Sequence, residues 1–250
     1  MRRMLNCLGF LLFFAAFPSV AEEEKEQTAY AAERAAMVDI VEAEARLSAS
    51  ETGVRAVSPA VLEAMRAVPR HLFLPPALQV AGYLNMPLPA MPGATVSQPL
   101  IVALMLHEAD VQAEEEALVV GVGAGYLTSL LVELGASVRA LEYDEAIASY
   151  ATARFEELGY SSVNLKIGDG YYGWPDGEQS FDAIIVRLAV PEIPPPLLAQ
   201  LAPGGRLVAP VGQPEGRQWL TVVERDEEGE LRQRRLLEVR FTPLPGGIRL

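Results

Sequence analysis

LVVGVGAGY, at residues 118–126, is the stretch that decides the fold. An apolar run that ends in Gly121, Gly123 and Gly125 is typical of a buried strand followed by a glycine-lined turn and a helix. Because glycine permits tight backbone angles and the close approach of a bound molecule, the turn is either a ligand-binding loop or a plain crossover turn. A dinucleotide-binding loop carries another glycine at its sixth position, where this chain has Tyr126.

The sequence after residue 116 alternates between strand-like and helix-like segments. Short strands separated by single helices form right-handed crossovers and a parallel sheet that is covered on both faces. The tail has two strand-like segments without a helix between them, which predicts antiparallel strands at one edge. The pattern indicates an α/β, Rossmann-like fold with a mostly parallel sheet. The expected strands are 117–122, 137–143, 163–169, 181–188, 204–212, 218–226 and 231–244, and the expected helices are 124–135, 144–159 and 191–201.

Two carboxylates follow the next strands, at the edge where sheets of this kind bind their ligands. Glu142 ends the second strand, where a carboxylate can accept hydrogen bonds from both hydroxyl groups of a ribose. Asp169 ends the third strand, where it can accept a bond from an adenine amino group or begin an Asx turn. With Tyr143, Gly170 and the three loop glycines, these residues favour S-adenosylmethionine over NAD, because the loop has no feature that holds a pyrophosphate.

The residues before this core are expected to be helical or irregular. An Ala- and Glu-rich segment at 23–48 predicts an exposed helix, and Ser58 followed by proline predicts a second helix at 59–67. Residues 77–96 are rich in proline and glycine, which predicts a loop, and helical spacing resumes at 97–109. We divide the chain into an N-terminal helical segment with a substrate loop (22–96), a Rossmann-like cofactor-binding core (97–212) and C-terminal antiparallel strands that complete the same domain (213–250).

Residues 1–21 have the pattern of a secretory signal peptide. Arg2 and Arg3 precede an apolar stretch, and Ser19 and Ala21 supply the small residues of a cleavage site. The apolar stretch is short for a membrane span. We therefore expect an exported, periplasmic protein, or a cytoplasmic one if the leader is not used. The single cysteine lies inside the leader, so the mature protein would use no thiol chemistry.

Composition narrows the classes of partner. The chain has 250 residues, of which 50% are hydrophobic, and a net charge of −13 at pH 7, which suits one acidic globular domain. A negative surface repels phosphates, so the charge argues against nucleic acid and anionic membranes as partners. The two histidines, His71 and His107, lie away from the strand ends, which indicates structural or surface roles, and we expect no metal site.

Longer motifs along most of the chain carry a resemblance to a known family. They are VLEAMRAVPRHLFLPP (61–76), MPLP (86–89), TVSQPLIVALM (95–105), GDGYYGWP (168–175), FDAIIV (181–186), PEIPPPLL (191–198) and PGGRLVAPVG (203–212). With the glycine loop, they resemble the protein-L-isoaspartate (D-aspartate) O-methyltransferases.

The resemblance implies a class I methyltransferase fold with S-adenosylmethionine as methyl donor. It also implies that the methyl acceptor is the α-carboxylate of L-isoaspartyl residues in damaged proteins. Such methylation is a protein-repair reaction. The resemblance also implies that Ser97 is the active-site serine that orients the acceptor by hydrogen bonding, with Thr95 and Gln98 in the same loop. Ser97 also suits the N-cap of the helix that follows it.

The chain departs from the family's pattern at several positions, including Ala94 and the pair Leu84 and Asn85, and two further places concern the ligands directly. Val119 stands where the family usually has an acidic residue that holds the methionine end of the cofactor. Arg187 and Leu188 stand where the family usually has small residues, so Arg187 either fills the pocket or binds the acceptor carboxylate.

The leading hypothesis is an exported methyltransferase that acts as a monomer on proteins or peptides containing isoaspartyl residues. One alternative is a catalytically weakened or inactive binding protein of the cell envelope that keeps the methyltransferase fold. Another alternative is a methyltransferase that acts on a different carboxylate.

Overall fold

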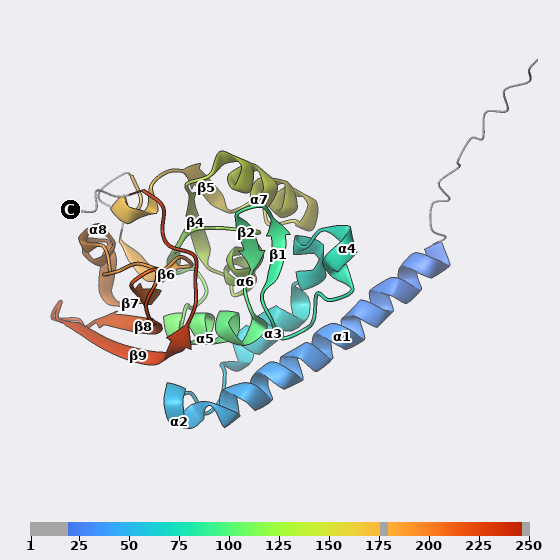
Figure 1. Cartoon of the computed structure of the whole chain (residues 1–250), viewed down its shortest axis with the longest axis horizontal. Helices are drawn as coiled ribbons and strands as arrows, with labels where there is room; N and C mark the ends of the chain where they lie inside the picture. The colour runs from blue at the N-terminus through green and yellow to red at the C-terminus, as the bar shows by residue number, and fades with distance from the viewer. Residues whose placement is uncertain (1–19, 176–179, 247–250) are drawn as a thin grey trace, which may run out of the picture.

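A computed structural model describes residues 20–175 and 180–246 and places a seven-stranded sheet at the centre of the molecule (Figure 1). The strand order is β5-β4-β3-β6-β7-β8-β9. The first five strands in this order are parallel, and β8 and β9 run antiparallel to their neighbours, which confirms the predicted sheet. The strands are β3 (Glu116–Val120), β4 (Ser137–Glu142), β5 (Asn164–Ile167), β6 (Phe181–Val186), β7 (Leu201–Gly212), β8 (Gln218–Arg225) and β9 (Leu231–Val239).

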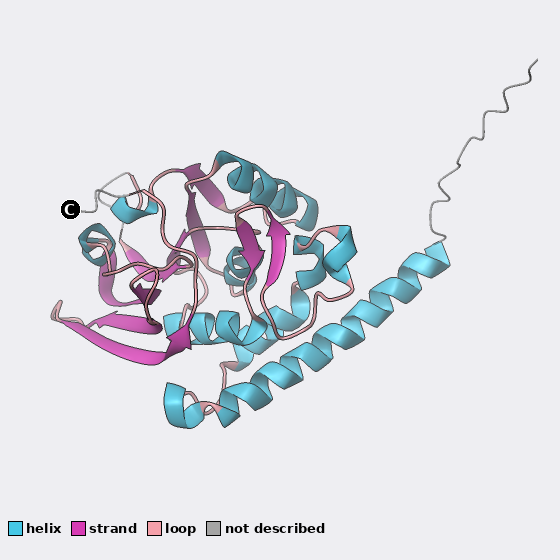
Figure 2. Ribbon diagram, in the orientation of Figure 1, coloured by secondary structure: helices cyan, strands magenta, loops and turns pink. Residues whose placement is uncertain are grey.

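Helices pack on this sheet, and a two-stranded hairpin lies in front of it in the view of Figure 2. Asp144 caps α7 as its type predicts, because its carboxylate accepts bonds from the backbone N–H groups of Ala146 and Ile147. The α-helices are α1 (Val20–Leu47), α2 (Ala49–Thr52), α3 (Pro59–Ala67), α4 (Pro76–Gln79), α5 (Pro99–Ala109), α6 (Tyr126–Glu133), α7 (Glu145–Leu158) and α8 (Pro195–Ala199), with 3₁₀ turns η1 (Arg70–Phe73) and η2 (Gly170–Tyr172).

Two clusters of buried apolar side chains lie on the two faces of the sheet. Successive side chains of a strand point to opposite faces, so Val119 joins one cluster and Leu118 joins the other. The cluster around Val119 is the larger, and it includes buried residues of α1, α3, α5, α6 and α7. The opposite cluster is closed by Trp174, Leu197 and Leu244. Both faces are therefore covered, as predicted, but the helices are concentrated on one of them.

The N-terminal helix differs in part from its prediction. The sequence predicts an exposed helix at 23–48, and α1 forms over nearly that range. One face of its C-terminal half is buried, however, with Met37, Val38 and Val41 at 1% exposure or less, because this face packs against α3 and α5. The signal-peptide prediction concerns residues 1–21, and residues 1–19 lie outside the described part of the chain. Within residues 20–175 and 180–246, no helix is long and apolar enough to span a membrane.

The predicted loop at 77–96 contains a β-hairpin, so that prediction is wrong. Strand β1 (Leu88–Met91) pairs with β2 (Ala94–Val96) across a turn at Pro92 and Gly93. Buried Leu88 and Ala90 alternate with exposed Pro89, and the same alternation continues in β2. The proline and glycine content concealed this period of two.

The helix predicted at 191–201 is also largely wrong, because α8 contains only Pro195–Ala199. Residues 194–196 are three consecutive prolines, and a residue that precedes a proline is disfavoured in helical geometry. The helix therefore begins only within the proline run. Leu201, which the sequence places in the helix, begins strand β7.

Both histidines have structural partners. The ring of His71 stacks on Tyr30 with centroids 4.0 Å apart, and its Nδ1 lies 2.7 Å from the hydroxyl oxygen of Tyr83. His107 accepts a hydrogen bond through Nδ1 from the backbone N–H of Ser58 at 3.2 Å. Burial, with a smaller effect of Arg34, lowers the pKa of His71 from 6.5 to about 4.

His71 should make the stability of the fold depend on pH. The unfolded chain binds a proton at this residue below pH 6.5, whereas the folded chain keeps it neutral down to about pH 4. Its stabilisation is therefore complete above pH 6.5 and is lost as the pH falls from 6.5 toward 4. Between these limits we expect the wild type to lose about 1–3 kcal/mol more stability than His71→Phe, measured by urea unfolding. Parallel stability curves for the two proteins would contradict this assignment.

Candidate active site

A cavity of about 920 Å³ opens at the carboxyl ends of the parallel strands β3, β4 and β6. This is the edge at which open α/β sheets bind ligands, and the volume suits a small molecule. The structure brings eight of the predicted site residues to its wall. They are Thr95, Ser97 and Gln98 from residues 95–98 (called the acceptor loop below, after the role predicted for Ser97), Gly121 and Gly123 after β3, Glu142 and Tyr143 at the end of β4, and Arg187 after β6.

Glu142 lies at the inner wall of the cavity and is only 5% exposed. One carboxylate oxygen accepts a hydrogen bond from Gly123 N at 3.1 Å, and the other accepts bonds from Tyr143 N at 2.9 Å and Asp144 N at 3.3 Å. The carboxylate therefore ties the glycine loop to the end of β4. A carboxylate oxygen has two acceptor positions, so Glu142 keeps capacity for further donors on the cavity side.

The glycine loop is packed closely against the residues that follow β6. Gly121 and Gly123 have positive φ angles of 80° and 57°. A Cβ at Gly121 would lie 2.6 Å from Cδ1 of Leu188, and a Cβ at Gly123 would lie 2.6 Å from NH1 of Arg187. Glycine is therefore needed at both positions for conformation and for space.

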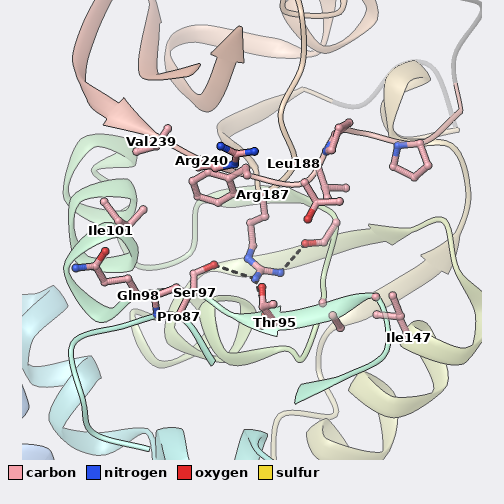
Figure 3. A pocket seen from close by; sticks show the side chains of 18 of the residues that line it. Pro87, Thr95, Ser97, Gln98, Ile101, Ile147, Arg187, Leu188, Val239 and Arg240 are labelled. Carbon is pink, nitrogen blue, oxygen red and sulfur yellow. Dashed lines mark hydrogen bonds between the residues drawn. The ribbon is translucent and has the colours of Figure 1, made fainter. Parts of the chain in front are cut away.

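The guanidinium group of Arg187 lies between the glycine loop and the acceptor loop (Figure 3). Its NH1 donates to the carbonyl oxygens of Gly121 at 2.8 Å and Val122 at 2.5 Å. Its NH2 donates to the carbonyl oxygen of Thr95 and to Oγ of Ser97, both at 3.3 Å. Burial lowers the pKa of Arg187 to about 10, against an opposing effect of Glu142, so the group is cationic at neutral pH. In this conformation Arg187 lines the cavity with its guanidinium held against the glycine loop, and binding of an acceptor carboxylate by it stays a prediction.

Arg70 positions the acceptor loop, a role that the sequence analysis did not assign to it. The side chain is completely buried and donates from NH2 to the carbonyl oxygens of Met86 and Ser97 at 3.0 and 3.1 Å. NH1 donates to the carbonyl oxygen of Gly82. The guanidinium also lies 5.8 Å from the ring centroid of Tyr126, at the start of α6. Arg70 therefore joins the segment that carries Ser97 to the helix that follows the glycine loop.

Three predicted cofactor residues are not in the wall of the cavity. Asp169 accepts a bond from Tyr171 N at 3.0 Å, which is the Asx turn that the sequence allowed, and a Cβ at Gly246 would lie 2.3 Å from its Oδ2. Gly170 packs against Val120. Gly125, the third, lies at the N-cap of α6. Their roles toward a cofactor stay predictions.

Val119 is buried in the core and does not line the cavity. It is fully inaccessible in β3, where its register partners are Ala140 in β4 and Ile185 in β6. Its side chain belongs to the larger apolar cluster. In this chain a valine at position 119 fits its surroundings, and the group nearest the glycine-loop carbonyls is the cation of Arg187.

The cavity has a further wall that the sequence analysis missed, namely the end of β9 and the segment after it. Ala189 fixes this segment through two backbone bonds, from its N–H to the carbonyl oxygen of Thr242 and from Leu244 N to its carbonyl oxygen, both 2.8 Å. Strand β9 ends at Val239, and Pro243 forms an isolated parallel bridge with Ala189. The lining residues are Leu237, Glu238, Val239, Arg240, Phe241, Thr242, Pro243 and Pro245.

The donors and acceptors of the cavity fit S-adenosylmethionine. Glu142 can accept bonds from ribose hydroxyl groups, and the carbonyl oxygens of Gly121 and Val122 can accept bonds from an ammonium group. The glycines leave the loop backbone uncovered by side chains of its own, although Leu188 and Arg187 lie against it in this structure. No group of three or more metal-ligating side chains occurs among the described residues.

Comparisons with known proteins show the family of the chain. The profile of the family described as protein-L-isoaspartate(D-aspartate) O-methyltransferase matches residues 44–248. Protein-L-isoaspartate O-methyltransferase 2 of Syntrophobacter fumaroxidans is 46% identical over 218 residues, which are 87% of this chain and 88% of that protein. Protein-L-isoaspartate O-methyltransferase 1 of Cupriavidus necator is 43% identical over 218 residues, 87% of this chain and 84% of that protein.

Solved structures show the same architecture. A structure described as protein-L-isoaspartate O-methyltransferase has a TM-score of 0.73 and 27% identity, with 85% of this chain and 66% of that chain covered. A Plasmodium falciparum structure described as an enzyme of the same name, in complex with S-adenosyl-L-homocysteine, has a TM-score of 0.65 and 23% identity, with 75% and 90% covered, and supports the fold. The chain therefore belongs to the protein-L-isoaspartate (D-aspartate) O-methyltransferase family and is an S-adenosylmethionine-dependent methyltransferase.

Proposed function

We propose that this chain methylates the α-carboxylate of L-isoaspartyl residues in damaged proteins of the cell envelope. The observation that carries the proposal is the meeting of Ser97, Glu142 and the glycine loop in one cavity of a chain with this family membership. In this proposal Glu142 holds the cofactor and Ser97 donates a hydrogen bond to the acceptor.

The reaction places modest demands on the protein. S-adenosylmethionine supplies an electrophilic methyl group, and a carboxylate is already ionised at neutral pH, so no general base is required. The site must align the acceptor oxygen with the methyl group and exclude water. The described cavity residues fit these tasks, because Ser97 and Arg187 offer donors to a carboxylate and the wall from 237 to 243 encloses the site.

Ser97→Ala tests the proposed acceptor role. Loss of one hydrogen bond to an ionised acceptor is worth about 1.5–3 kcal/mol, so we expect kcat/KM for an isoaspartyl peptide to fall about 10- to 100-fold. Affinity for S-adenosylhomocysteine, measured by calorimetry, should change little, because the hydroxyl serves the acceptor. Ser161→Ala, at an exposed serine outside the cavity, is the matched control. An unchanged kcat/KM in Ser97→Ala would remove Ser97 from the acceptor site.

The location in the cell envelope rests on the leader-like pattern of residues 1–21. A phosphatase reporter that is active only after export, fused after Ala21, should be active in a bacterial host. Substituting the apolar residues of the leader by charged residues should abolish this activity. A reporter that stays inactive places the enzyme in the cytoplasm. The proposed methylation of envelope proteins is then wrong, whereas the proposed methylation of isoaspartyl residues is unaffected.

Binding without transfer would favour one of the alternative functions. Calorimetry with S-adenosylmethionine, followed by transfer assays on isoaspartyl and unmodified aspartyl peptides, separates them. Cofactor binding without transfer to either peptide supports a different acceptor carboxylate. Absence of cofactor binding at millimolar concentration supports a binding protein, a reading favoured by the way Arg187 occupies the glycine-loop carbonyls.

A further inference from the structure

Arg187 holds two parts of the cavity with unequal strength. NH1 makes short bonds of 2.8 and 2.5 Å to the carbonyl oxygens of Gly121 and Val122. NH2 makes longer bonds of 3.3 Å to the carbonyl oxygen of Thr95 and to Oγ of Ser97. Nε is buried and has no hydrogen-bond partner among the described residues. The guanidinium is therefore held firmly on the glycine-loop side and loosely on the acceptor side.

The glycine-loop side is where the cofactor also needs acceptors. S-adenosylmethionine and S-adenosylhomocysteine both end in an amino acid group with an ammonium, which needs carbonyl or carboxylate oxygens as partners. The loop carbonyls of Gly121 and Val122 are such partners, but NH1 of Arg187 already uses both. Two cations cannot share these two oxygens without strong repulsion at this distance.

The acceptor side is where a released guanidinium would find a new partner. Arg187 lies beside Ser97, and the acceptor brings a carboxylate to that place if the proposed function holds. A guanidinium binds a carboxylate through two parallel hydrogen bonds, a stronger arrangement than two bonds to neutral carbonyls. The change breaks the two NH1 bonds to the loop carbonyls, which the ammonium replaces, and rotates a long side chain that makes no bond at Nε.

We propose that the cofactor's ammonium displaces Arg187 from the glycine-loop carbonyls and that Arg187 then binds the acceptor carboxylate beside Ser97. The inference rests on the proposed function and assigns to Arg187 both acceptor specificity and a coupling between the two ligands. Since the cofactor moves Arg187 toward the acceptor, and the acceptor holds it there, each ligand strengthens the binding of the other. Thermodynamic linkage requires the two effects to be equal.

Calorimetric titration with S-adenosylhomocysteine alone tests the displacement. Arg187→Met removes the competing cation with little change in length, and we expect the affinity for S-adenosylhomocysteine to rise about tenfold. Arg187→Gln, a neutral side chain that can still donate hydrogen bonds, should give the same direction and serves if the methionine variant does not fold. Arg232→Met changes the charge equally on a residue whose side chain is 79% exposed and should leave the affinity unchanged. An equal or lower affinity in the Arg187 variants overturns the displacement.

Titration with an isoaspartyl peptide tests the coupling. In the wild type, saturating S-adenosylhomocysteine should tighten peptide binding about five- to tenfold, and the peptide should tighten S-adenosylhomocysteine binding by the same factor. In Arg187→Met, peptide binding should weaken and this factor should fall to about one. Equal coupling in the wild type and the variant overturns the inference while the proposed function survives. If S-adenosylhomocysteine binds neither protein, the proposed function itself fails.

Discussion

Replacement of Arg70 by leucine is expected to lower the free energy of unfolding by about 3–5 kcal/mol, the largest stability effect that we predict. The carbonyl oxygens of Gly82, Met86 and Ser97 would lose a charged donor at a site that is completely buried. Burial lowers the pKa of Arg70 from 12.5 to about 10. The leucine side chain replaces part of the volume and none of the hydrogen bonds.

Urea unfolding of Arg70→Leu against Arg66→Leu measures this effect. Arg66 is close in sequence and bridges Glu63 and Asp39, but these are surface ion pairs with partners 73% exposed. Its loss should cost less than about 1 kcal/mol. If both variants lose equally little stability, Arg70 does not hold the acceptor loop in the way its contacts indicate.

Replacement of Glu142 by alanine is expected to weaken the binding of S-adenosylhomocysteine about 100-fold. The carboxylate accepts a bond from Gly123 N in the glycine loop and lies in the cavity wall, where we propose that it also accepts bonds from ribose hydroxyl groups. Two charge-assisted hydrogen bonds of about 1.5 kcal/mol each correspond to a loss of this size. Glu142→Gln keeps one acceptor oxygen, so we expect an intermediate loss of about tenfold.

Calorimetric titration of S-adenosylhomocysteine into the two Glu142 variants and into Glu145→Gln tests this prediction. Glu145 begins α7 only three residues later, is exposed and does not line the cavity, so its variant makes the same charge change nearby. Only the Glu142 variants should lose affinity. Unchanged binding in Glu142→Ala would mean that the ligand does not rest on the end of β4.

The fold was predictable wherever local pattern and final position agree. An apolar run predicts the buried strand that contains Val119, and the capping residue Asp144 predicts the start of the helix that follows it. Both elements form near their expected bounds. The hairpin of β1 and β2 was missed because its turn residues resemble a loop, although Leu88, Ala90 and Val96 already alternate with exposed positions. Burial of α1 depends on contacts with α3 and α5, which no local pattern contains.

The site was predictable at the strand ends and less so elsewhere. Glu142 and the loop glycines meet because β3 and β4 are parallel neighbours, and parallel strands place their carboxyl ends at the same edge of the sheet. Arg70 was missed because a buried arginine is rare and its partners are backbone carbonyls, which have no sequence signature. Asp169 was predicted to contact the cofactor but does not line the cavity. Its position at a strand end did not reveal that the chain near Gly246 packs against its carboxylate.

The wall formed by residues 237–243 is the last part of the cavity to be synthesised, so the cavity is completed late. During synthesis the glycine loop, Glu142 and Arg187 emerge first, but the cavity stays open on one side until the last strand has paired and the segment after it has bonded to Ala189. A nascent chain can therefore form most of its sheet and still lack an enclosed place for its ligands. If the protein crosses a membrane unfolded, it becomes competent only at its destination, after the final residues have followed.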